Sequence, residues 1–277
     1  MSEFNEIDTT SVEIAVETES TQVNNPINGF AEFGLAPELM AALADMNFTA
    51  PTPVQQKVLP LAMGTQSGDN EQFQDLMVSS QTGSGKTAAF LLPVLQGVIK
   101  YHNEQRRLEK ETLDKKTSQT ADHGEEIKKE KRRNPRDSRN FRTPTPYALV
   151  MCPTRELAQQ VAQDAVKLMT HCKGLRVASV VGGMPYQVQV SKLQNANIVV
   201  ATPGRLLDLQ RSMQLKLDQV KFLVLDEADR LLDLGFAEDL ADIDDLTRGR
   251  SQTMMFSATF SPRVQTLAAA IMTSPMK

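Results

Sequence analysis

The sequence predicts an α/β domain built on a mostly parallel sheet with helices on both faces. Three observations lead to this fold class. Six short apolar runs are continuous rather than alternating in polarity, which is typical of strands covered on both faces. Helical patterns lie between several of these runs, which favours parallel strands joined by crossovers. Polar clusters with Gly or Pro follow nearly every run, and open parallel sheets bind ligands at the carboxyl ends of their strands.

The elements can be placed in order along the chain. Residues 1–28 are acidic and rich in Ser, Thr and Asn, so we expect a disordered acidic tail, followed by the domain over residues 29–277. Apolar residues at helical spacing predict helices over residues 35–43, 54–63, 155–169 and 186–193. The apolar runs predict strands over residues 76–79, 147–152, 177–181, 198–201, 222–225 and 253–256.

Residues 101–146 interrupt this alternation. They are dense in Lys, Arg, Glu and Asp, and their basic residues concentrate between 128 and 142. A segment of this length inside a compact domain is usually functional or disordered. We expect a charged, flexible insertion, and the alternative is a basic arm that adds nonspecific phosphate contacts.

The bulk composition limits the possible functions. The 277 residues are 40% hydrophobic, which is enough for a core, and the net charge of −4 does not by itself indicate nucleic-acid binding. Cys152 and Cys172 lack metal-ligand spacing to any histidine, which favours reduced thiols of a cytosolic protein. No apolar run approaches the roughly 20 residues that span a bilayer, and the N-terminus lacks a secretory pattern. We therefore expect a cytoplasmic protein without a membrane partner.

Two polar segments carry the strongest functional signal. Residues 80–87 read Ser-Gln-Thr-Gly-Ser-Gly-Lys-Thr, between a predicted strand and a helix, where small residues let backbone N–H groups converge on phosphate oxygens. Lys86 adds a positive charge, and Thr87 offers a hydroxyl to magnesium. Residues 226–229 read Asp-Glu-Ala-Asp directly after an apolar run, which supplies carboxylates for a hard cation. Ser80 replaces the first glycine of the strict phosphate-loop pattern, but the strand–loop–helix context remains. Together the segments indicate a nucleoside triphosphatase.

The chain resembles the first RecA-like domain of DEAD-box RNA helicases, because these two segments and several others occur in the order that is typical of that family. The resemblance covers residues 30–277 apart from the insertion, and it implies a RecA-like P-loop NTPase domain that uses ATP and Mg²⁺ and binds RNA. The matching segments are residues 48–55, 80–87, 153–158, 182–183, 202–205, 226–229 and 257–259.

The resemblance implies how a nucleotide is held. Gln55 would read adenine, since an amide can pair bidentately with the N6 and N7 atoms. Phe30 would stack on the base, because its register fits the family, while Phe33 is expected in the core. The phosphates would be held by Thr82, Gly83, Ser84, Gly85, Lys86 and Thr87.

The resemblance also implies the chemistry. Thr87 and Asp226 would position the metal ion, and Lys86 would contact the β and γ phosphates. Glu227 would orient and activate the attacking water, which makes Lys86, Asp226 and Glu227 the expected catalytic residues. Ser257 and Thr259 would hydrogen-bond to Asp229 and couple the nucleotide site to the RNA surface.

Residues after other strands would bind RNA. None of them is expected to read base edges, so binding would be sequence-independent and made to the backbone. The residues implied by the resemblance are Thr154, Arg155, Gly183, Thr202 and Arg205.

The family's second RecA-like domain does not lie within this sequence. We therefore expect the isolated chain to bind ATP or ADP weakly, to hydrolyse ATP very slowly and not to unwind RNA, because an arginine from the second domain usually contributes to the rate. Two alternatives stay open. One is a DNA-directed P-loop helicase, and the other is a nucleotide-gated RNA-binding fragment without helicase activity. Competition between single-stranded RNA and DNA would discriminate the first alternative.

Overall fold

The computed structural model describes residues 29–67, 70–81, 83–121 and 143–276. Six parallel strands form its main sheet in the order β3-β8-β7-β4-β6-β5. The predicted tail over residues 1–28 lies outside the described residues. All six predicted strands are confirmed to within about a residue or two, and their bounds are Leu76–Ser79 (β3), Ala148–Met151 (β4), Val177–Val180 (β5), Ile198–Ala201 (β6), Phe222–Leu225 (β7) and Gln252–Ser257 (β8).

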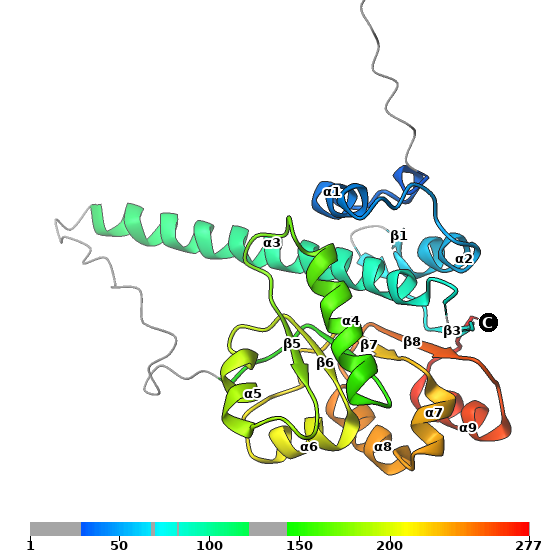
Figure 1. The fold of residues 1–277 in the computed structure, drawn as a ribbon. Helices are drawn as coiled ribbons and strands as arrows, with labels where there is room; N and C mark the ends of the chain where they lie inside the picture. Colours follow the sequence, from blue (N-terminus) through cyan, green and yellow to red (C-terminus); the bar gives the residue numbers. More distant parts are fainter. Residues whose placement is uncertain (1–28, 68–69, 82, 122–142, 277) are drawn as a thin grey trace, which may run out of the picture.

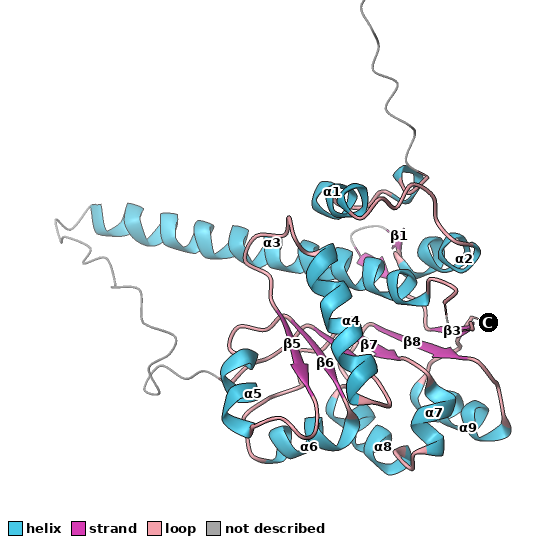
Figure 2. Cartoon of the chain, viewed as in Figure 1, coloured by secondary structure: helices cyan, strands magenta, loops and turns pink. Residues whose placement is uncertain are grey.

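Helices cover both faces of this sheet (Figures 1 and 2). The first group over one face is α1 (Pro37–Asp45), α2 (Pro53–Ala62), α3 (Lys86–Ala121) and α4 (Arg155–Leu168). The second group over the other face is α5 (Tyr186–Leu193), α6 (Pro203–Arg211), α7 (Ala228–Asp233), α8 (Ala237–Leu246) and α9 (Pro262–Ile271). A short 3-10 helix (Ala31–Phe33) precedes α1, and a small antiparallel hairpin, β1 (Thr65–Ser67) and β2 (Asn70–Gln72), precedes β3. The predicted α/β class with a parallel sheet is confirmed.

The two apolar cores follow from alternation along the strands. Successive residues of a strand point to opposite faces, so a fully apolar run feeds both cores. In β4, Val150 packs in the core beneath α1 to α4, whereas Leu149 and Met151 pack in the core beneath the second group of helices. Every residue of β4 is buried, which explains why the apolar runs do not alternate in polarity.

Helix α3 extends well beyond the buried part of the domain (Figure 1). It runs for 36 residues, so the expected insertion over residues 101–146 begins as helix up to Ala121. Residues 122–142 lie outside the described residues. Glu, Lys, Arg and Gln are good helix formers, and Arg107 lies 2.7 Å from Glu104 and 3.9 Å from Glu111 one turn away on either side. Local propensity therefore sustains a helix where no apolar face is available.

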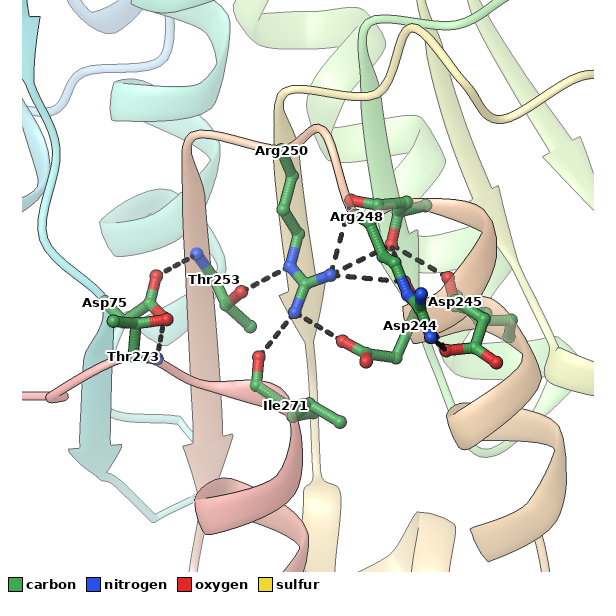
Figure 3. Close-up of polar contacts among 10 residues, drawn as sticks. Asp75, Asp244, Asp245, Arg248, Arg250, Thr253, Ile271 and Thr273 are labelled. Atoms are coloured by element: carbon green, nitrogen blue, oxygen red, sulfur yellow. Dashed lines mark hydrogen bonds and ion pairs between the residues drawn. The ribbon is translucent and has the colours of Figure 1, made fainter.

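A polar network at the amino ends of the strands fixes β3 at the edge of the sheet (Figure 3). The Asp75 carboxylate accepts hydrogen bonds from the backbone N–H groups of Thr253 and Thr273, both at 2.6 Å. The half-buried Arg250 side chain donates to Thr253 Oγ1 at 2.7 Å and to the carbonyl of Ile271. These contacts join the starts of β3 and β8 to the end of α9, and so anchor the strand that leads into residues 80–87.

No helix among the described residues has the length and apolar character to cross a membrane. Cys152 is buried and Cys172 is half-buried, and both are free thiols. Burial raises the pKa of both, to about 11 for Cys172 and well above the ordinary value for Cys152, so both thiols stay protonated near neutral pH.

Candidate nucleotide and RNA sites

The order of the strands sorts the polar segments along one edge of the sheet. Because all strands of the main sheet are parallel, the segments that follow them emerge at the same edge. The predicted phosphate loop follows β3 and the acidic segment follows β7, with the segment of Ser257 and Thr259 after β8 between them. The predicted RNA-binding residues follow β4, β6 and β5, on the other half of the sheet. The edge therefore divides in two: the half with the predicted nucleotide-binding segments is called the nucleotide half, and the half with the predicted RNA-binding residues is called the RNA half.

Lys86 lies between two carboxylates in the nucleotide half. Its Nζ is 3.1 Å from Asp226 Oδ1 and 3.1 Å from Glu227 Oε1. The side chains are 10% exposed for Lys86, 0% for Asp226 and 16% for Glu227, so water screens the cluster little. Burial is the strongest influence on the pKa of Asp226 and raises it, while Lys86 opposes the rise. Burial lowers the pKa of Lys86, but the two carboxylates outweigh burial and raise it overall.

This cluster fits a divalent cation. Asp226 is fully buried, yet its Oδ2 has no hydrogen-bond partner among the described residues. Orphaned buried oxygens of this kind are costly, and a hard cation or its bound water satisfies them. Thr87 directly follows Lys86 at the start of α3, beside the cavity described below. Both residues therefore neighbour Lys86, Thr87 along the chain and Asp226 through the ion pair.

The backbone of Glu227 has an uncommon conformation. Its φ and ψ of 51° and 57° lie in the left-handed region, which non-glycine residues rarely adopt. Its Oε1 pairs with Lys86, and its Oε2 lies 3.5 Å from Arg230 Nη1. Strained backbone of this kind clusters at functional sites, because the surrounding structure must enforce it.

A cavity of about 380 Å³ adjoins the phosphate loop. Its wall includes Gln55, Gly85 and Thr87, together with residues of the turn before α2. The Gln55 amide accepts a hydrogen bond from Thr52 N at 2.9 Å and donates one to the Gly85 carbonyl at 3.0 Å. One lone pair and one amide hydrogen of Gln55 therefore remain for a ligand. Gly85 has φ of +87°, and a Cβ there would lie 2.7 Å from the Gln55 amide nitrogen, so only glycine fits this approach.

Other predicted nucleotide-binding residues lie less directly at this cavity. Gly83 lines it, and Ser84 lies in the same loop with a buried hydroxyl that has no hydrogen-bond partner among the described residues. Thr82 lies outside the described residues. Phe30 is fully buried in the core, with its ring 6.3 Å from that of Phe33, and it does not line the cavity. As it lies, Phe30 has no exposed ring face to offer to a base.

The coupling residues are joined by hydrogen bonds across β7 and β8. Asp229 Oδ2 accepts from both the N–H and the hydroxyl of Thr259, each at 3.1 Å. The Ser257 hydroxyl contacts the backbone instead of the expected carboxylate, since it accepts from Asp229 N at 3.3 Å and donates to the Thr259 carbonyl at 2.7 Å. The acidic segment is therefore tied to the end of β8 through both side chain and main chain.

The RNA half centres on the loop after β5. Arg155 Nη1 donates to the Gly182 carbonyl at 3.3 Å, and Arg205 Nη1 donates to the Met184 carbonyl at 3.2 Å. Gly183 has φ of +78°, and a Cβ there would overlap the Arg155 guanidinium. The structure thus brings two arginines from different helices to one glycine-containing loop.

Two helices start at the same edge. Thr154 begins α4, where its hydroxyl accepts a hydrogen bond from Leu157 N at 3.3 Å. Thr202 begins α6, and its side chain makes no capping bond among the described residues. Helix N-termini favour anions, because their first N–H groups lack partners within the helix. This half can therefore hold phosphates through backbone N–H groups, arginines and hydroxyls together.

Sequence reasoning missed Gln189, which is fully buried on α5 and hydrogen-bonds to the loop after β5. A single glutamine within a helical pattern carries no local signal of this role. It also missed Arg230 beside Glu227, although Arg230 lies only three residues further along the chain.

This chain matches a protein family and several known proteins in sequence. A family model described as DEAD/DEAH box helicase matches residues 52–267. The DEAD-box ATP-dependent RNA helicase 52A of Oryza sativa subsp. japonica is 37% identical over 262 residues, which cover 93% of this chain and 38% of that protein. The ATP-dependent RNA helicase RhlB of Pseudomonas syringae is 37% identical over 250 residues, which cover 89% of this chain and 52% of that protein. The chain thus spans about half the length of these relatives or less.

Solved structures agree. The RNA helicase Prp28 of Chaetomium thermophilum, bound to ADP, superposes with a TM-score of 0.66 at 34% identity, covering 91% of this chain and 50% of that one. A DEAD box protein of Methanococcus jannaschii gives a TM-score of 0.66 at 30% identity, covering 90% and 55%. The similarity extends over both the nucleotide half and the RNA half of the sheet edge. The chain therefore belongs to the DEAD/DEAH box helicase family, and it contains a RecA-like domain of the kind found in that family.

Proposed function

We propose that this chain is the ATP-binding half of an ATP-dependent RNA helicase. It binds ATP with Mg²⁺ at the ends of β3 and β7, and it binds the backbone of single-stranded RNA at the ends of β4, β5 and β6. The observation that carries this proposal is the position of Lys86, held at 3.1 Å from both Asp226 and Glu227 beside a glycine-rich loop. An ammonium in this position can exchange carboxylate oxygens for phosphate oxygens.

The charges of the cluster explain why nucleotide and metal would bind together. When Lys86 turns to the phosphates, the fully buried Asp226 loses its ion-pair partner, and Glu227 keeps only Arg230 among the described residues. Mg²⁺ held by Thr87 and Asp226 would supply the missing positive charge and neutralise charge on the transferred phosphoryl group. Glu227 keeps a more exposed side chain on a fixed backbone, which suits it to accept a proton from the attacking water through its carboxylate.

RNA binding would be independent of sequence. Arg155 and Arg205 offer forked donors, and the N–H groups of Gly182 and Gly183 form no hydrogen bond with other described residues. These groups suit phosphate oxygens and cannot distinguish bases. Ser257 and Thr259 would couple the nucleotide site to the RNA surface through Asp229, since their hydrogen bonds tie the acidic segment to the end of β8.

Duplex remodelling would need a second RecA-like domain. The relatives are roughly two to three times as long as the stretch that this chain matches, which leaves room for such a domain in them. An arginine supplied to the γ-phosphate from outside a nucleotide site is commonly worth about 10³-fold or more in rate. We therefore propose that this chain alone hydrolyses ATP very slowly and does not unwind duplexes.

Titration with a fluorescent adenosine nucleotide and Mg²⁺ tests the proposal. Binding should be measurable for the native chain, and Lys86→Ala should weaken it by about tenfold or more, because a charge-assisted contact to phosphate is lost. Lys57→Ala, on an exposed position of α2, serves as the matched control. Undetectable binding by the native chain, or equal binding by Lys86→Ala, would contradict the nucleotide site.

Competition with single-stranded RNA and DNA tests the RNA half separately. Labelled RNA should be displaced by unlabelled RNA of unrelated sequence, since the contacts are made to the backbone. An ATPase assay with and without RNA tests the need for a second domain. RNA-stimulated turnover at the rates of complete helicases, about 1 s⁻¹ or more, would refute it.

A further inference from the structure

The loop of residues 181–184 after β5 must be held in place by groups outside it. Two consecutive glycines, Gly182 and Gly183, contribute no side chains, and Gly183 takes a positive φ of 78°. Glycine has the greatest conformational freedom in the unfolded chain, so an ordered pair of glycines needs external contacts to define one geometry.

Gln189 supplies these contacts from α5. Its Oε1 accepts from Val181 N at 3.0 Å, and its Nε2 donates to the Val181 carbonyl at 3.0 Å and to the Met184 carbonyl at 3.1 Å. The three hydrogen bonds hold the loop on both sides of the glycine pair, at Val181 before it and at Met184 after it. They also define the orientation of the amide, because only the nitrogen can donate to two carbonyls.

The hydrogen bonds to the loop use both hydrogens of the Gln189 amide. Gln189 is 0% exposed, and a buried amide is costly unless it is hydrogen-bonded. Both hydrogens of Nε2 are used, so a carboxylate in this position would face two carbonyl oxygens without a donor. A leucine would fill similar space and leave the loop without these bonds.

Two arginines dock on the same loop. Arg155 reaches the Gly182 carbonyl from α4, and Arg205 reaches the Met184 carbonyl from α6. Gln189 and the two arginines thus occupy the carbonyls of Val181, Gly182 and Met184, while the N–H groups of the two glycines form no hydrogen bond with other described residues. A displaced loop would move both arginines and both N–H groups together.

We propose that Gln189 is the positioning residue of the RNA-phosphate site. Its amide fixes the loop so that two backbone N–H groups and two guanidinium groups face one stretch of RNA backbone. The inference rests on the proposed RNA-binding function and adds a buried residue that touches no RNA itself. Gln189 acts through the loop, so its loss should affect RNA binding and leave nucleotide binding unchanged.

Gln189→Leu tests this, with Gln187→Leu as the matched control, since Gln187 is exposed on the same helix. Fluorescence anisotropy measures affinity for a labelled single-stranded RNA and, in parallel, for a labelled adenosine nucleotide. We expect Gln189→Leu to weaken RNA binding by about tenfold, the equivalent of ~1.4 kcal/mol, with nucleotide affinity within about twofold of the native chain. Hydrogen exchange of the Val181 N–H, which donates to the Gln189 amide oxygen, should accelerate in Gln189→Leu and not in Gln187→Leu.

The outcomes separate the inference from the proposed function. If the native chain binds RNA and Gln189→Leu binds it equally well, or if exchange in the loop is unchanged, the positioning role is overturned. If the native chain binds no RNA, the proposed RNA-binding function is wrong, and the inference is wrong with it because it rests on that function. If Gln189→Leu does not fold, Gln189→Asn takes its place, because its amide is one methylene too short to reach both carbonyls. Parallel losses of RNA and nucleotide binding would indicate a purely structural role and would also overturn the inference.

Discussion

Replacing Lys86 by methionine should destabilise the fold in a pH-dependent way. The ammonium is the counter-charge of Asp226, which is 0% exposed, and of Glu227, which is 16% exposed. Removing one partner of a buried ion pair commonly costs about 3–5 kcal/mol, because the other charge stays buried and unpaired. Total stabilities are about 5–15 kcal/mol, so the change should be obvious in unfolding experiments.

Protonation of Asp226 limits this cost. Burial already raises the pKa of Asp226 in the folded chain, and without Lys86 the strongest opposing influence on that pKa would be lost. An acid with a raised folded pKa contributes stability below its unfolded pKa and loses it as the pH rises through the folded pKa. The deficit of Lys86→Met should therefore be small at about pH 4 and grow towards about pH 8, at up to ~1.4 kcal/mol for each pH unit above the unfolded pKa until the folded pKa is reached.

Urea unfolding of the native chain and Lys86→Met at several pH values measures the difference. Lys57→Met, an exposed substitution on α2, should stay within about 0.5 kcal/mol of the native chain throughout. Adding Asp226→Asn to Lys86→Met should recover much of the loss, since it removes the buried charge. A deficit that is absent at about pH 8, or equal at both ends of the range, would refute the reasoning.

Three further substitutions test other parts of the structure. Gly97→Ala would place a Cβ against the ring of Phe222, so we expect a loss of about 1–3 kcal/mol in urea unfolding despite the better helix propensity of alanine. Asp75→Asn puts an amide where a carboxylate accepts two backbone N–H groups, and should lower stability by about 1–3 kcal/mol, visible as a reduced melting temperature. Gly183→Ala would collide with the Arg155 guanidinium at a positive φ, and should reduce RNA affinity about tenfold or more in anisotropy while nucleotide affinity stays unchanged. An unaffected value in any of these measurements would contradict the corresponding contact.

The strands were predictable because their signal is local. Residues 198–201 and 222–225 are apolar throughout, and both are buried at every position. The hairpin of β1 and β2 was not predicted, since its residues are polar and show no alternation. Residues 101–121 were expected to be part of a flexible insertion and instead continue α3, because charged helix formers can hold a helix without a buried face.

The candidate site was only partly predictable. The predicted phosphate loop and the acidic segment are each a continuous stretch of sequence, so a nucleotide site can be predicted from the residues alone. The pairing of Lys86 with Glu227 joins residues 141 positions apart, and the buried state of Phe30 depends on packing between elements. A role of Phe30 in adenine stacking stays a prediction, which would require its ring to become accessible.

By itself, the sequence determined the parallel α/β architecture and the two segments that are predicted to bind a nucleotide, because backbone conformation and burial leave local patterns. Only the tertiary structure decided that these segments share one half of a sheet edge, that the RNA-type residues share the other half, and that Gln189 supports the loop between the arginines. Strand order is set by packing between segments far apart in the chain. No local sequence pattern predicts which strands are neighbours in the sheet.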